Sequence, residues 1–208
     1  KATGKKRQLQ PGDAKYEKIF GIANQYILQW QSEPNVDWGS LYDPGYEIGT
    51  VSATNTYPLD LTEINKISDI PGDSVTIYVG GNSVEYVVVA PEHLKRYRGT
   101  NACAQIGENL RFAKSFDENS PEFGGRIEVP VYTRASLLKN QNSRVPVDDP
   151  MWVVLMCAAD YVRNDTMLKD QYDIILAEAN QVMQKMIENN GPQLSELFTS
   201  GIPGVSDI

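Results

Sequence analysis

The stretch DSVTIYVGGNSVEYVVV, residues 73–89, is the part of the chain that best predicts its fold. Period-two alternation of apolar residues is typical of a strand with one buried face. Both halves of the stretch show it, at Val75, Ile77 and Val79 and then at Val84, Tyr86 and Val88. Gly80, Gly81 and Asn82 lie between the halves and are residue types that adopt the positive φ angles of tight hairpin turns. The stretch therefore predicts a β-hairpin.

Similar short runs extend outward from the hairpin, from residue 35 to about residue 134. They are rich in Val, Ile and Tyr and are separated by clusters of Gly, Pro, Asn and Asp. The runs are YEIGTVSA (46–53), TYPLDL (56–61), NLRFAKSF (109–116) and RIEVPVYT (126–133). Because no helical pattern separates these runs, they indicate a small antiparallel barrel or sandwich.

Helical periodicity appears on both sides of the strand-rich region. Residues 13–34 begin with Asp13, a residue type that caps helices, and Pro34 ends the pattern. Between them, apolar residues recur every three or four positions, at Tyr16, Ile19, Phe20, Ala23, Tyr26, Ile27 and Trp30. Residues 147–190 contain two more helical patterns, of which the second ends at Gly191, a common C-terminal signal.

The first of these later patterns, DDPMWVVLMCAADYVRND (148–165), is apolar on every side. From Trp152 to Tyr161 the only charged residue is Asp160. The run is too short to cross a bilayer, which takes about 20 residues. A helix that is apolar all round is normally buried among several neighbours. The other two helices can cover two of its sides, so a third side is left for the β domain or for a neighbouring subunit, which favours an oligomer.

These patterns together predict an α+β protein. We expect a helical bundle of one N-terminal and two C-terminal helices, formed by residues 13–34 and 147–190. An antiparallel β barrel or sandwich, residues 35–146, is inserted into the bundle. Both termini are expected to be extended. Residues 1–12 are expected to form a flexible basic arm, and residues 191–208 a C-terminal docking tail.

Composition and charge restrict the classes of function. The chain has 208 residues and a net charge of −8, and it is long enough to bury a core without disulfides or metals. Residues 1–18 carry six basic side chains against two acidic ones, so the rest of the chain is more acidic still. Because phosphate contacts need clustered Lys and Arg, an acidic body argues against a surface that grips nucleic acid. Cys103 and Cys157 are far apart and are predicted to be reduced thiols.

Few residues have the chemistry of a catalytic site. His93 is the single histidine and has no nearby Cys partner, so a surface or capping role is expected, and nucleotide, zinc and calcium motifs are absent from the sequence. Pairs of carboxylates are the one enzyme-like feature, because acid/base hydrolysis needs two of them a few ångströms apart. The pairs are Asp60 and Glu63, Asp69 and Asp73, and Asp148 and Asp149. Turns and helix caps also explain these residues, so we expect no enzyme, no cofactor and no metal site.

An aromatic-rich stretch, WQSEPNVDWGSLYDPGY (30–46), follows the first helical pattern. Such rings serve equally in core packing where a helix meets a sheet, in a protein interface or in a sugar-binding platform. All three interpretations are open. As a hypothesis, we assign Trp38 and Tyr42, together with Trp152, to a subunit interface.

Two long segments of the chain carry a resemblance to a known family. They are KYEKIFGIANQYILQWQSEPNVDWGSLYDPGYEIGTVSATNTYPLD (15–60) and VPVDDPMWVVLMCAADYVRNDTMLKDQYDIILAEANQVMQKMIENN (145–190). In the order of their predicted elements and in their residue pattern, they resemble the head-to-tail adaptor proteins of tailed bacteriophages, which are also called neck or connector proteins. The resemblance spans residues 13–190 and rests on no single diagnostic motif.

The resemblance implies a structural virion protein. Such adaptors form rings, typically of about twelve copies, in the virion neck between capsid and tail, after assembly in the host cytoplasm. The implied partners are the portal protein above, a downstream tail or nozzle protein, other copies of the chain, and double-stranded DNA that passes during genome ejection without sequence-specific binding. No membrane is involved. The C-terminal tail resembles the segment that reaches the portal, with Leu194, Leu197 and Phe198 as docking residues.

A second hypothesis comes from another class of protein. The carboxylate pairs and the aromatic stretch are also compatible with a tail-associated module that binds or hydrolyses carbohydrate or cell wall. The basic arm at residues 1–12 is a departure from the adaptor family, and its role is open.

Overall fold

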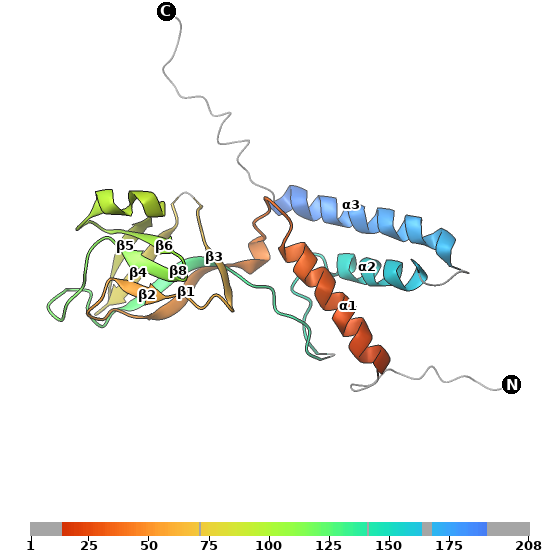
Figure 1. The fold of residues 1–208 in the computed structure, drawn as a ribbon, viewed down its shortest axis with the longest axis horizontal. Coiled ribbons are helices and arrows are strands. Elements are labelled where there is room, and N and C mark those ends of the chain that lie inside the picture. Colours follow the sequence, from red (N-terminus) through yellow and green to blue (C-terminus); the bar gives the residue numbers. More distant parts are fainter. Residues whose placement is uncertain (1–13, 71, 141, 164–167, 191–208) are drawn as a thin grey trace, which may run out of the picture. The chain divides into compact units, whose positions relative to one another are not determined.

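The computed structural model describes residues 14–70, 72–140, 142–163 and 168–190. The chain divides into two compact units. Residues 41–134 form one of them, which we call the β unit. Residues 1–40 and 135–208 form the other, which we call the helical unit. Figure 1 labels the α-helices and most of the strands of the two units.

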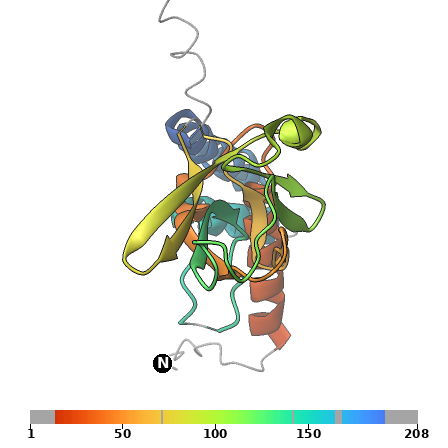
Figure 2. The same cartoon turned by 90° about the vertical axis from the view of Figure 1, so that its left-hand side faces the viewer.

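The β unit is one curled sheet, seen end-on in Figure 2. Its strands are β1 (Tyr42–Thr50), β2 (Thr56–Pro58), β3 (Ile64–Ile67), β4 (Ser74–Val79), β5 (Asn82–Val88), β6 (Ala102–Ile106), β7 (Asn109–Phe112) and β8 (Arg126–Thr133). Their spatial order is β1-β8-β4-β5-β6-β7-β2, and β3 pairs with β8 beside this path. The 3₁₀ helix η2 (Pro91–Tyr97) connects β5 to β6. A second 3₁₀ helix, η1 (Gly39–Leu41), precedes β1.

The predicted hairpin is confirmed. Strands β4 and β5 pair antiparallel, and the pairing closes with Val79 opposite Asn82. The turn contains Gly80 at φ 56° and Gly81 at φ 83°, angles that favour glycine. Val75, Ile77 and Tyr86 point inward and are fully buried, as the alternation predicts. The hairpin therefore follows from local residue choice alone.

The pairing of β5 with β6 differs from the predicted antiparallel arrangement. Strands β5 and β6 pair parallel, with Val87 opposite Ala102, so the sheet is mixed rather than antiparallel. Parallel neighbours need a crossover connection. Residues 89–101 provide it, and Leu94 of η2 anchors it with a buried side chain. The connection is too short and too polar to show a helical period in the sequence.

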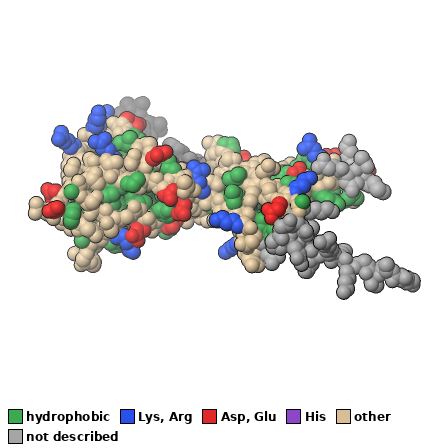
Figure 3. All heavy atoms as spheres, turned by 60° about the horizontal axis from the view of Figure 1, so that its bottom comes forward, with side chains coloured by type: hydrophobic (Ala, Val, Ile, Leu, Met, Phe, Trp, Pro, Cys, Tyr) green, Lys and Arg blue, Asp and Glu red, His purple; other side chains and the backbone are tan. Residues whose placement is uncertain are grey.

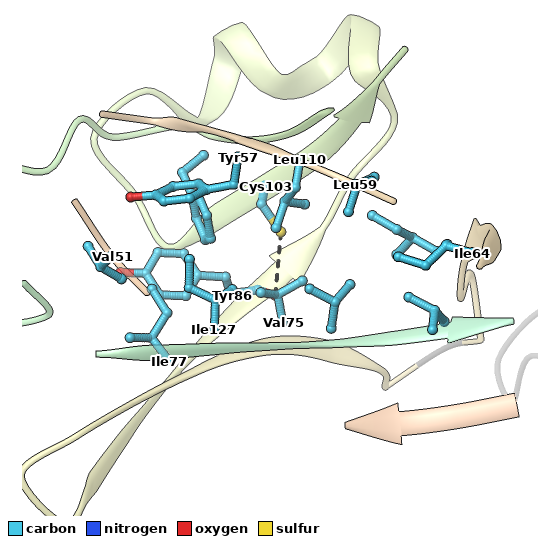
Figure 4. Packing of buried hydrophobic residues seen from close by; sticks show 14 of the residues in the cluster. Val51, Tyr57, Leu59, Ile64, Val75, Ile77, Tyr86, Cys103, Leu110 and Ile127 are labelled. Atoms are coloured by element: carbon cyan, nitrogen blue, oxygen red, sulfur yellow. Dashed lines mark hydrogen bonds between the residues drawn. The ribbon is translucent and has the colours of Figure 1, made fainter. Parts of the chain in front are cut away.

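One apolar cluster fills the concave side of the sheet (Figure 4). Aromatic rings meet edge to face within it. The ring centroids of Tyr86 and Phe112 are 4.9 Å apart, and those of Phe112 and Phe116 are 5.2 Å apart. Such contacts contribute about 0.5–1.5 kcal/mol each beyond the area they bury. The thiol of Cys103 lies in this cluster, and burial raises its pKa to about 12.

The described part of the helical unit consists mainly of α-helices, with a short 3₁₀ helix before the last of them. They are α1 (Ala14–Gln31), α2 (Pro150–Arg163), η3 (Lys169–Gln171) and α3 (Tyr172–Asn190). Helix α3 runs antiparallel to α2, and the Asn190 side chain at its end donates a 2.7 Å hydrogen bond to Asp148 just before α2. The extended chain from residue 135 onward follows α1, where Asn24 exchanges two hydrogen bonds with the backbone of Leu138.

The predicted fold class was therefore wrong. The protein is mainly a curled mixed sheet with three helices, not a helical bundle with an inserted barrel or sandwich. Helix α2 packs against both α1 and α3, but α1 and α3 do not pack along each other. The reason is that α1 buries Trp30 against Trp38, whose ring centroid lies 4.6 Å away, and not against a third helix. Both termini, residues 1–13 and 191–208, lie outside the described residues.

Candidate assembly surface

Helix α2 begins where the sequence provides an N-cap. The Asp149 carboxylate accepts a 2.9 Å hydrogen bond from the backbone N–H of Met151. Pro150 occupies the first helical position, where its missing N–H costs nothing. From there to Arg163 nothing breaks the helix. The cap thus sets the start of the helix and with it the direction of each apolar side chain.

Part of α2 is covered by the other helices of the unit. Its buried side chains are Trp152, Val153, Ala159 and Val162. The Trp152 ring meets the ring of Tyr26 from α1 edge to face, with centroids 6.0 Å apart. Tyr26 also donates a hydrogen bond to Asp160 of α2. Burial first, and then this bond, raises the pKa of Tyr26 to about 12.

Another face of α2 is apolar and uncovered. Met151 is 53%, Val154 57% and Tyr161 71% exposed, and Ala158 is half-buried between them. At 3.6 residues per turn these positions form one stripe along the helix. We call these four residues the α2 face. Large apolar side chains that share one stripe in water mark an interaction surface more often than scattered ones do.

The helical unit exposes further large apolar side chains. They are Ile19 and Leu28 of α1, Leu137, and Ile174 of α3. The Cys157 thiol of α2 is half-buried. Burial and then the Asp160 charge raise the pKa of this thiol. Both cysteines are free, as predicted.

The three residues assigned to a subunit interface lie in different surroundings. Trp38 and Trp152 are each only 2% exposed, and the Trp38 ring nitrogen donates a 2.9 Å hydrogen bond to the carbonyl of Trp30. Tyr42 belongs to the β unit and donates a 2.9 Å bond to Asp73. Of the three residues assigned to an interface, the two tryptophans are therefore buried within the protomer. Their interface role stays a prediction, and the tryptophans could contribute to it only by supporting their neighbours.

The docking residues assigned to the C-terminal tail, Leu194, Leu197 and Phe198, lie outside the described residues. The same holds for the basic arm, residues 1–12. His93 lies exposed on η2, which is the surface position expected for it.

The first two carboxylate pairs lie in the β unit. Asp60 accepts hydrogen bonds from the side chain and the backbone N–H of Thr62, and these bonds lower its pKa. Glu63 accepts a 2.9 Å bond from the Tyr46 hydroxyl. In the second pair, Asp69 lies 3.5 Å from the Lys66 ammonium and Asp73 binds the Tyr42 hydroxyl. These carboxylates hold turns and strand ends.

The third pair, Asp148 and Asp149, binds the ends of α3 and α2 respectively. The hypothesis of a carbohydrate-hydrolysing module stays a prediction. Within the described ranges, no cluster of three or more His, Cys, Asp or Glu side chains could hold a metal ion. No helix in that part of the chain is both long and apolar enough to cross a membrane.

Sequence reasoning missed one buried charged cluster. Glu122 is only 5% exposed, and its Oε1 accepts a 2.6 Å bond from the Lys114 ammonium and a 3.0 Å bond from the Tyr86 hydroxyl. The ammonium also lies over the rings of Tyr86 and Phe116, 5.1 Å and 5.5 Å from their centroids. Burial alone would raise the pKa of Glu122, but these bonds and one from its own backbone lower it on balance. The cluster ties the loop before β8 to the sheet, and no periodic pattern in the sequence marks it.

Comparison with models of known protein families and with curated proteins finds no match to this chain.

Proposed function

We propose that this chain is a structural protein of a phage virion, which assembles with copies of itself into a ring between portal and tail and extends the DNA channel. The α2 face carries the proposal. Met151, Val154 and Tyr161 present apolar area on the most apolar helix of the chain, and the described residues of the protomer leave that area in water. The resemblance of residues 13–190 to head-to-tail adaptors supports the same function.

The occupant that we propose for the α2 face is a second copy of this chain. Around the exposed stripe the helix carries one basic residue, Arg163, and one acidic residue, Asp160, which is already bonded to Tyr26. A partner surface without strong charge, such as another apolar helix, therefore fits better than a nucleic acid or an acidic peptide. Head-to-tail contacts between copies close into a ring when the rotation between neighbours permits it.

The test is electron microscopy of the full chain, alone and mixed with the portal protein of its virion. Wild-type protein is expected to form rings stacked on the portal. Val154→Glu should abolish the rings, because it places an unpaired charge in an interface from which water is excluded. It should leave the free energy of unfolding within about 0.5 kcal/mol, since the site is exposed in the protomer.

Val87→Glu is the matched control. Val87 of β5 is 60% exposed against 57% for Val154, so the same substitution changes charge equally on the other unit. Rings in the control and none in Val154→Glu would support the assignment. Normal rings in Val154→Glu would remove the α2 face from the interface. Rings lost only on deletion of residues 191–208 would assign assembly to the tail. A wild-type chain that never associates with the portal or with itself would overturn the function.

A further inference from the structure

The connection between β5 and β6 concentrates positive charge in a chain whose net charge is −8. Within HLKRYR, residues 93–98, Lys95, Arg96 and Arg98 carry full positive charges. Glu92 is the single acidic residue between positions 89 and 101. Since charges interact over only about 8 Å at physiological salt, this local excess matters more to a ligand than the distant acidic residues do. We call residues 93–98 the basic turn.

The fold presents the basic turn to solvent. Leu94 is buried and anchors η2, whereas the other five side chains of the turn are exposed. In Figure 3, Lys and Arg side chains gather at the upper left of the view, at the end of the β unit where η2 lies. The backbone after η2 is held in place, because the carbonyl of Tyr97 accepts bonds from the N–H and the hydroxyl of Thr100. The N–H of Gly99 donates to the carbonyl of Ala113.

The cations of the basic turn are also uncompensated. Three of the other five basic side chains of the β unit bind carboxylates: Lys66 lies beside Asp69, Lys114 beside Glu122 and Arg126 beside Glu128. Among the residues that the structure describes, no ion pair involves Lys95, Arg96 or Arg98. Placing three like charges within four residues without counter-ions costs repulsion, which a polyanionic ligand would relieve.

Tyr97 adds a hydroxyl group to the basic turn. It lies between Arg96 and Arg98 in the chain, and its side chain is 43% exposed. Guanidinium groups match phosphate oxygens with two parallel hydrogen bonds. The Tyr97 hydroxyl can add a hydrogen bond to a phosphate oxygen of a duplex, and contacts of this kind carry no sequence information. A duplex presents its phosphates in a fixed array, whereas an acidic polypeptide would have to be ordered when it binds.

We propose that the basic turn binds the phosphate backbone of nucleic acid without sequence preference. Residues 95–97 end the 3₁₀ helix and Arg98 follows it with an extended backbone, so at about 2 Å of rise per helical residue and about 3 Å for the extended one, residues 95–98 span about 7 Å. This length covers about two phosphates of one strand, which follow one another every 3.4 Å or so along the duplex axis. The binding does not require the proposed ring. A ring would repeat the turn around a passing duplex and raise the avidity.

The experiment measures fluorescence anisotropy of a labelled duplex of about 30 base pairs of mixed sequence, titrated with the full chain at several salt concentrations. The test variant is Lys95→Gln/Arg96→Gln/Arg98→Gln. All three side chains are exposed, so the fold should survive, and circular dichroism checks this. The control variant is Lys139→Gln/Arg144→Gln/Lys185→Gln, which removes equal charge from exposed positions of the helical unit.

Wild type is expected to bind more weakly as salt rises, with a log–log slope near −0.9 for each phosphate contacted. The test variant should lose at least tenfold in affinity, with a shallower slope, while the control loses about twofold or less. Equal losses in both variants would mean that net charge alone matters and would overturn the proposal. So would binding that disappears on deletion of residues 1–12 but persists in the test variant. Competition by polyglutamate as effective as competition by unlabelled duplex would replace nucleic acid by an acidic polypeptide.

Loss of ring formation in Val154→Glu with DNA binding retained would separate this inference from the proposed function. Conversely, rings that form normally in the Lys95→Gln/Arg96→Gln/Arg98→Gln variant would show that ring formation does not depend on the basic turn.

Discussion

The two units of the chain bury their apolar side chains to different extents. Nine of the twelve largest fully buried side chains belong to the β unit. The helical unit has the other three, Ile27, Trp30 and Trp38, and none of these lies on α2. Yet α2 is the most apolar segment of the sequence, and it leaves Met151, Val154 and Tyr161 exposed.

This difference shows what each architecture can do alone. A curled sheet has a concave side, so residues from strands far apart in sequence meet there and exclude water from one another. Helices that do not form a bundle leave faces without a neighbour, and α2, which is apolar on more than one side, has such a face. The β unit therefore has the larger fully buried core, whereas the described helices leave an apolar stripe on α2 that the proposed partner copy would cover.

The largest expected effect is on the β unit. Phe112→Ala removes the ring that contacts Tyr57, Tyr86 and Phe116. It should lower the free energy of unfolding of this unit by about 3–5 kcal/mol, as is usual for Phe→Ala in a packed core. The measurement is urea denaturation followed by circular dichroism at a β-sheet wavelength.

Tryptophan fluorescence gives the comparison in the same titration. Trp30, Trp38 and Trp152 all belong to the helical unit, so their signal reports that unit alone. We expect the fluorescence midpoint to move much less than the dichroism midpoint. Equal shifts of the dichroism and fluorescence midpoints would show that the two units unfold together, which would contradict the idea that their cores are independent.

A smaller effect is expected at the buried ion pair of the β unit. Lys114→Met leaves the Glu122 carboxylate with Tyr86 as its remaining side-chain donor. The loss of a charged hydrogen bond at a buried group should cost about 2 kcal/mol at neutral pH. Lys95→Met, at an exposed position, is the control and should change stability by about 0.5 kcal/mol or less. Equal losses in the two variants would assign the effect to charge rather than to the pair.

The pH dependence at Glu122 follows from the direction of its pKa shift. Its pKa is lower in the folded protein than the ordinary value of a glutamate, so the folded state favours the ionised form. The contribution of Glu122 is present above that ordinary value and is lost as the pH falls through the lowered one. Glu122→Gln should therefore remove part of the acid dependence of the dichroism midpoint. An unchanged dependence would contradict the ionised pair.

The smallest of these effects is expected in the helical unit. Asp149→Ala removes the cap that accepts the N–H of Met151 and should cost about 1 kcal/mol, read from tryptophan fluorescence. Asp149→Asn should restore most of the loss, since Asn caps about as well as Asp. A loss that Asn does not restore would mean that charge at the start of the helix, not the hydrogen bond, is what stabilises α2.

Local patterns in the sequence predicted the helices and most of the strands, but not β3 or β6. The β4–β5 hairpin follows from alternation around two glycines, and α1, α2 and α3 follow from apolar spacing between caps and breakers. These signals succeed because turn geometry and helix capping depend on residues a few positions apart. The apolar character of α2, from which we predicted a neighbouring subunit, was also visible in the sequence.

Which side of α2 stays uncovered was not visible, and neither was the basic turn as a presented surface. The sequence shows Met151, Trp152, Val153 and Val154 as four similar neighbours, but only the packing of α1 and α3 decides that two are buried and two exposed. In the same way, HLKRYR becomes a presented surface because Leu94 alone is anchored in the crossover. Exposure is a property of neighbours and not of residue type.

The sequence by itself determined the hairpin, the helices α1, α2 and α3 and the Asp149 cap of α2, because those structures are stabilised by contacts within a few residues of each other. Only the tertiary structure decided the parallel β5–β6 pair, the buried Glu122 cluster and the absence of a bundle. Each of these depends on contacts between segments distant in the chain. Their free energy comes from excluding water between surfaces that no short pattern brings together.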